Sequence, residues 1–163
     1  MTKEGFTKYE SNWHSHRPLL WEALEATKHF KLPILELGCG EGSTPLLQAY
    51  CKENDLQLFS YDFNVQYATQ YGAVHITDWN NLPWRRDYGV VLVDESPGEH
   101  RKISLQLLHH VKIVVAHDTE PAADHGYKMR AELAKYKFLI DYQTIGAWAS
   151  AVSNFINITK FEI

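Results

Sequence analysis

The sequence has few cysteines, no long apolar run and no excess of positive charge. The only cysteines are Cys39 and Cys51, and Cys39 lies in a glycine-rich turn, so we expect no structural disulfide and a reducing, cytoplasmic location. We expect no membrane span and no secretion signal, because no stretch has the required apolar length. The formal net charge of −4 offers no basic field to phosphate backbones, which argues against a nucleic-acid substrate.

The length and the composition of the chain are typical of one globular domain. The chain has 163 residues, of which 45% are hydrophobic and 22% are charged. Its five tryptophans and nine tyrosines are many for this length. Most of these rings belong in the core, and some are available to stack on a planar substrate or on adenine. We therefore expect a single domain over residues 1–163.

Short apolar runs alternate with helix-like segments, which is typical of an α/β sheet with crossover helices. The predicted strands are short apolar or alternating runs at residues 34–37, 56–61, 73–76, 89–93, 111–116, 138–140 and 151–158. The predicted helices are residues 17–29 with Ser15 as the cap, a helix from residue 44, and residues 65–71, 96–109 and 122–135. The run Ser96-Pro97-Gly98-Glu99 has the form of a capping box, and the last two strands are expected to form an antiparallel edge.

Polar residues end four of the predicted strands. In open α/β sheets, ligands bind beyond the carboxyl ends of the strands, near the point where the strand order reverses. The polar strand ends are Glu36 with the following glycines, Asp62, Asp94 with Glu95, and His117 with Asp118. Their recurrence indicates a ligand site at this edge of the sheet.

The glycine-rich turn lies directly between a strand and a helix. Gly38, Gly40 and Gly42 permit a tight turn and let a ligand approach the backbone closely. Asp62 ends the next strand, where an acid is placed to accept hydrogen bonds from two ribose hydroxyls. The pattern predicts a ligand of the adenosine type.

Residues 34–42, ILELGCGEG, resemble motif I of the class I S-adenosylmethionine-dependent methyltransferases. The acid two residues before the first glycine distinguishes this motif from the dinucleotide-binding fingerprint. The resemblance follows the strand order from about Ile34 to Ala116. It implies an α/β, Rossmann-like fold with a mostly parallel seven-stranded sheet, an antiparallel C-terminal strand and helices on both faces. It also implies S-adenosylmethionine as the cofactor.

The same resemblance divides the chain into an N-terminal lid or helix (residues 1–30), a cofactor-binding core (residues 34–118) and a C-terminal helix with strands (residues 119–163). It implies that Glu36 anchors the ammonium end of the methionine moiety, and that Asp78 and Trp79 contact adenine. Trp79 could equally be a core or rim aromatic. The expected cofactor-binding residues are Glu36, Gly38, Cys39, Gly40, Gly42, Ser43, Asp62, Phe63, Asp78, Trp79 and Asp94.

The run from Asp94 to Pro97 lacks the Asp/Asn-Pro-Pro-aromatic motif of nucleic-acid amino-methyltransferases, so that activity is not supported. Metal-dependent small-molecule O-methyltransferases and the cephalosporin hydroxylase-like group carry acids at the ends of strands four and five. By similarity, Asp94 and Asp118 could hold Mg²⁺ or another divalent ion, with His117 or Glu95 nearby. Acids at strand ends can equally be solvated or cap the following helix.

The candidate catalytic residues are Asp94, His117 and Asp118. His117 and His100 are candidate general bases, although a lone histidine is more often a surface residue. In many class I methyltransferases the segment before motif I folds over the site. Trp13, His16 and Arg17 are therefore candidate lid residues, and the alternative is a polar lead-in to a helix.

These features predict a methyltransferase that acts on a small-molecule or peptide acceptor, with metal-assisted O-methylation as one option. One alternative is a non-catalytic module that binds the cofactor or its demethylated product. Another is a metal-dependent enzyme that uses the same scaffold for a different reaction. The edge strands and the tryptophans are also compatible with a homodimer.

Overall fold

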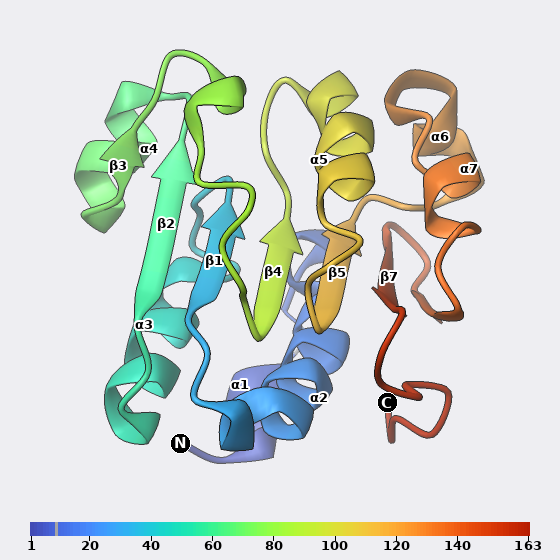
Figure 1. Ribbon diagram of the computed structural model, residues 1–163, viewed down its shortest axis with the longest axis horizontal. Coiled ribbons are helices and arrows are strands. Elements are labelled where there is room, and N and C mark those ends of the chain that lie inside the picture. Colours follow the sequence, from blue (N-terminus) through green and yellow to red (C-terminus); the bar gives the residue numbers. More distant parts are fainter. Residues whose placement is uncertain (9) are drawn as a thin grey trace.

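The computed structural model describes residues 1–8 and 10–163, and it contains one seven-stranded sheet in the order β3-β2-β1-β4-β5-β7-β6 (Figure 1). The first five strands are parallel, and β7 is antiparallel to both of its neighbours, β5 and β6. The strands are β1 Ile34–Leu37, β2 Leu58–Asp62, β3 Val74–His75, β4 Val90–Val93, β5 Ile113–His117, β6 Phe138–Gln143 and β7 Trp148–Ser153.

Helices cover both faces of this sheet. The helices are α1 Lys3–Thr7, α2 Arg17–Thr27, α3 Thr44–Asn54, α4 Val65–Tyr71, α5 Arg101–Leu107, α6 Pro121–Tyr127 and α7 Arg130–Leu133. One apolar cluster joins the sheet to α1, α2 and α3. A second cluster on the opposite face joins the sheet to α5 and α7. The strands β1 and β4 are buried along their whole length, because both of their faces are covered.

The structure confirms the predicted α/β class, the seven strands and the antiparallel C-terminal strand. The last two strands, β6 and β7, form the predicted antiparallel edge of the sheet. β7 lies inside the sheet, and the edge strand β6 is parallel to the first five strands. The last strand ends at Ser153 and not at the predicted residue 158. The chain turns there, because Ser153 Oγ accepts hydrogen bonds from the backbone N–H groups of Phe155 and Ile156.

The predicted capping box is wrong. α5 begins at Arg101, after a 3₁₀ turn over Gly98–His100, and Ser96 does not cap it. Tertiary contacts hold the preceding segment in a non-helical path, because the Ser96 carbonyl accepts a hydrogen bond from Trp79 Nε1 at 3.2 Å. The Glu95 carbonyl likewise accepts one from Arg101 Nε at 2.9 Å. These two bonds replace the local capping pattern.

Two further helix predictions need correction. The helix expected over residues 122–135 is split into α6 and α7, because Lys128 adopts a left-handed conformation with φ of 54°. The Asp124 side chain accepts a hydrogen bond from the backbone N–H of Arg130 at 2.8 Å, which stabilises the break. At the start of α2, the N-cap is His16 and not Ser15. The Ser15 hydroxyl contacts His117 instead, at 2.9 Å.

Candidate functional site

The glycine loop joins β1 to α3, and each of its glycines has a different structural role. Gly38 has φ of +86°, and a Cβ there would lie 2.3 Å from the backbone oxygen of Asp94. A Cβ on Gly42 would lie 2.4 Å from the backbone oxygen of Trp13. A Cβ on Gly40 would meet nothing nearer than 4.0 Å. Gly38 and Gly42 therefore allow close packing, whereas Gly40 faces open space that a ligand can approach.

Glu36 lies beneath this loop and is fully buried. Its carboxylate accepts hydrogen bonds from the hydroxyls of Ser43 at 2.6 Å, Thr44 at 2.9 Å and Ser60 at 2.6 Å. Burial raises the pKa of Glu36 to about 7, although the three hydroxyl donors act in the opposite direction. In this structure Glu36 holds the loop and the first turn of α3 in place. Its expected contact with a methionine ammonium stays a prediction.

Asp62 connects the loop to the next strand. Its Oδ2 accepts a hydrogen bond from the backbone N–H of Cys39 at 2.7 Å, and its Oδ1 accepts one from that of Asn64 at 2.6 Å. The neighbouring Phe63 side chain is exposed. The structure thus brings Asp62 to the glycine loop, and Phe63 follows it directly in the chain.

The two residues expected near adenine lie in different surroundings. Asp78 caps a 3₁₀ turn, and its carboxylate accepts a hydrogen bond from the backbone N–H of Asn80 at 2.9 Å. Trp79 is buried in the apolar cluster of α5 and α7, and its Nε1 donates to the Ser96 carbonyl. Of the two alternatives for Trp79, the structure supports the core aromatic.

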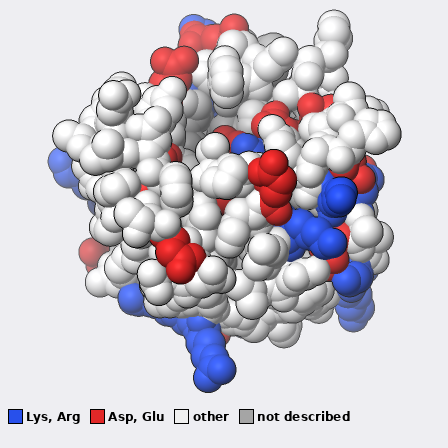
Figure 2. All heavy atoms as spheres, turned by 90° about the horizontal axis from the view of Figure 1, so that it is seen from above, with Lys and Arg blue, Asp and Glu red and all other residues white. Residues whose placement is uncertain are grey.

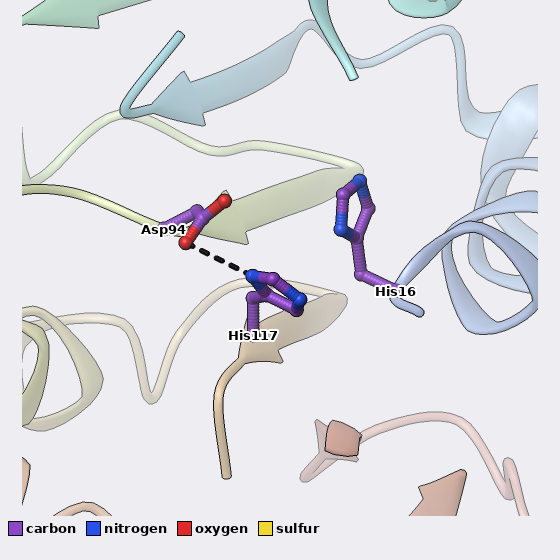
Figure 3. Close-up of side chains that lie close together, drawn as sticks. All are labelled: His16, Asp94 and His117. Carbon is purple, nitrogen blue, oxygen red and sulfur yellow. Dashed lines mark hydrogen bonds and ion pairs between the residues drawn. The ribbon is translucent and has the colours of Figure 1, made fainter. Parts of the chain in front are cut away.

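A cluster of charged and histidine side chains occupies the carboxyl ends of β4 and β5 (Figure 3). His117 Nδ1 lies 3.2 Å from Asp94 Oδ1. Arg101 contacts Asp94 at 2.8 Å and Asp118 at 3.0 Å. All three candidate catalytic residues therefore meet in one place, and Arg101 bridges the two carboxylates. No sequence signal identified Arg101, which reaches this cluster only through the tertiary fold.

The protonation of this cluster follows from its contacts. Burial lowers the pKa of His117, but the adjacent Asp94 carboxylate outweighs it and raises that pKa to about 9. Desolvation raises the pKa of Asp94, but His117 and Arg101 outweigh it and lower that pKa to about 2. Burial, with His117 close by, lowers the pKa of His16 to about 3. The cluster thus contains an ion pair beside a neutral imidazole.

The segment before α2 packs over the glycine loop. Arg17 is buried, and its guanidinium donates to the carbonyls of Gly42 at 2.8 Å, Glu41 at 3.3 Å and Lys8 at 3.0 Å. The Trp13 side chain is 69% exposed, although its carbonyl touches the loop. Of the three candidate lid residues, Arg17 and His16 are buried against the site and Trp13 points to solvent.

The face above the carboxyl ends of the parallel strands is mainly uncharged and is hollowed near its centre (Figure 2). Acidic and basic side chains lie together in the hollow, and most Lys and Arg side chains visible in this view lie toward the rim. Across the described part of the chain, no helix is long and apolar enough to cross a membrane.

The strand order and the position of the glycine loop define a Rossmann-like fold, which solved methyltransferase structures share. The METTL16 MTase domain matches with a TM-score of 0.58 and 13% identity over 91% of this chain and 71% of that one. The plantazolicin methyltransferase BpumL in complex with SAH matches with a TM-score of 0.53 and 14% identity, covering 86% of this chain and 85% of that one. At this identity the likeness shows the fold. No protein-family model and no curated relative matches the sequence.

Proposed function

We propose that the chain binds S-adenosylmethionine and transfers its methyl group to a small-molecule or peptide acceptor. The observation that carries the proposal is the glycine loop, which is held by Asp62 from β2 and by Arg17 from α2, with Gly40 facing open space. That open position suits the close approach of a ligand to the backbone at a strand-to-helix turn.

The side chains around the loop suit the parts of this cofactor. Asp62 can accept ribose hydrogen bonds through lone pairs that its two backbone contacts leave available, and the exposed Phe63 ring can cover the adenine. When bound, the cofactor supplies an already activated methyl group. The protein then has mainly to align the acceptor with that group. The cluster at Asp94 and His117 borders the loop, since Gly38 packs against the Asp94 backbone.

Metal-assisted O-methylation through Asp94 and Asp118 is the weaker form of this proposal. Arg101 lies within 3.0 Å of both carboxylates. A divalent ion bound between Asp94 and Asp118 would have to displace the Arg101 guanidinium. The proposed methyl transfer therefore does not use an ion bound to Asp118.

Calorimetric titration of the full chain with S-adenosylmethionine and with S-adenosylhomocysteine tests the proposal. Asp62→Asn should weaken binding about tenfold or more, which corresponds to about 1.4 kcal/mol. Asp55→Asn is the matched control, because Asp55 is exposed and has a left-handed backbone that asparagine tolerates. A folded wild-type chain that binds neither compound would refute the proposal.

The alternative is a module that binds the cofactor without catalysing transfer. Only two short helices, α6 and α7, lie between β5 and β6, so little chain is available there to build an acceptor pocket. Transfer of a labelled methyl group to pools of small molecules, peptides and RNA separates the two functions. Binding without transfer to any pool would favour the module, whereas transfer to RNA would refute the proposed acceptor class.

A further inference from the structure

Three side chains from distant parts of the chain converge at the carboxyl ends of β4 and β5 (Figure 3). His16, Asp94 and His117 each offer one ligand atom, and these atoms all lie within 4.8 Å of one another. The rings of His16 and His117 are 5.0 Å apart between centroids and nearly perpendicular. Two imidazoles and one carboxylate therefore face a common small volume.

His16 is the least satisfied member of this group. Its side chain is 1% exposed, and within residues 1–8 and 10–163 neither of its ring nitrogens has a hydrogen-bond partner. Leaving a buried polar group unpaired is energetically costly, so such groups in folded proteins usually have a further partner. A neutral imidazole with a free nitrogen is a ligand that transition metals prefer.

The contacts of His117 prepare it to act as a second ligand. Its Nε2 lies 3.2 Å from the Asn12 carbonyl and 2.9 Å from Ser15 Oγ. A carbonyl only accepts, so Nε2 carries the hydrogen that is donated to it. This leaves Nδ1, on the side of Asp94, as the nitrogen that can release its proton to solvent and bind an ion. Histidine ligands in metal sites are commonly oriented in this way by a backbone carbonyl.

Asp94 is held in a similar manner. Arg101 contacts its carboxylate at 2.8 Å and is itself paired with Asp118 at 3.0 Å. Carboxylate ligands are usually hydrogen-bonded to a further group that fixes their orientation. In this arrangement Asp118 acts through Arg101 and does not contact the ion.

We propose that His16, Asp94 and His117 bind one divalent transition-metal ion of the zinc class. Two nitrogens and one oxygen favour zinc, cobalt or iron over magnesium or calcium, which prefer oxygen ligands. Three protein ligands leave a coordination position open. The site borders the glycine loop, because a Cβ on Gly42 would lie 3.4 Å from Cε1 of His16.

The binding of the ion does not depend on the proposed methyl transfer. The role of the ion does rest on that proposed function. Beside a bound cofactor, it would lower the pKa of an acceptor hydroxyl and position the oxygen for attack on the methyl group. The proton released by the acceptor would pass to solvent or buffer, and the methyl group would pass from sulfur to oxygen.

The test uses the full chain after removal of metal with EDTA, and Zn²⁺ alone as the probe. Calorimetry should show one equivalent of Zn²⁺ bound by the wild type, and Co²⁺ should give the visible absorption of a low-coordinate site with nitrogen ligands. His16→Gln should weaken Zn²⁺ binding about a hundredfold or more. His125→Gln, at an exposed histidine of α6, is the matched control and should bind as the wild type does. Circular dichroism verifies that each variant is folded.

Two results would overturn the proposal. One is the lack of stoichiometric Zn²⁺ binding by the folded wild type. The other is a folded His16→Gln that binds as tightly as His125→Gln. If His16→Gln does not fold, Asp94→Asn replaces it, with the same expected loss and the same overturning result. Titration of the same samples with S-adenosylmethionine keeps the two proposals separate, because a chain that binds Zn²⁺ but not the cofactor refutes only the proposed function.

Discussion

The buried carboxyl of Glu36 should make the stability of this protein fall as the pH rises through the range in which the group ionises. Glu36 is fully buried beneath the glycine loop, and its pKa is raised to about 7 from an ordinary value of 4.5. Between these two values the folded protein retains a proton that the unfolded chain has released. Ionisation therefore favours the unfolded chain. Glu36→Gln preserves the shape and removes this titration.

The size of the effect follows from the two pKa values. One pKa unit corresponds to about 1.4 kcal/mol, so a shift from 4.5 to about 7 gives a maximum of about 3 kcal/mol. At pH 4.5 the raised pKa of Glu36 costs almost no stability, because the folded protein is protonated at this group and about half of the unfolded chains are protonated as well. At pH 8 nearly the full loss of stability is present, because Glu36 is ionised in both states. The stability of Glu36→Gln relative to the wild type should therefore increase by about 3 kcal/mol between pH 4.5 and pH 8.

Urea unfolding of both proteins at several pH values measures this difference. Glu41→Gln is the control, because Glu41 is an exposed carboxylate in the same loop and its substitution removes the same charge. A difference between Glu36→Gln and the wild type that does not change with pH would refute the reasoning. It would show that the hydroxyl donors of Ser43, Thr44 and Ser60 fully compensate the burial of the charge.

Three further predictions concern the same region. Gly38→Ala should cost about 2 kcal/mol or more in urea unfolding, since its Cβ would clash with the Asp94 backbone at positive φ; unchanged stability would contradict that geometry. Arg17→Met should lose about 1–3 kcal/mol, lower Tm by several degrees and speed hydrogen exchange in residues 10–16. An unchanged exchange rate would argue against Arg17 as the attachment of that segment. Arg101→Met should cost about 3–5 kcal/mol in thermal unfolding, because it removes the buried guanidinium that pairs with both Asp94 and Asp118, whereas a loss below 1 kcal/mol would contradict the bridge.

Much of the fold could be predicted from local patterns. The helix Val65–Tyr71 has its predicted bounds, and the apolar run that ends at Asp94 forms the buried strand β4. These segments are determined by capping and by apolar content, both of which are local properties. The predictions failed where tertiary contacts compete with a local pattern. At the expected capping box, hydrogen bonds from Trp79 and Arg101 take the place of the helical turn.

The sequence by itself determined the glycine loop and the acids at the strand ends. A positive φ and a polar residue after an apolar strand depend on nearby residues and therefore leave a local pattern, and a close approach of distant backbone is marked in the sequence by a glycine. Only the tertiary structure decided that His16 joins Asp94 and His117, and that Arg101 bridges Asp94 and Asp118. These groups come from the starts of α2 and α5 and from the ends of the neighbouring parallel strands β4 and β5. Burial and the attraction between charges depend on distances in the folded protein, and these distances cannot be predicted from the spacing of residues along the chain.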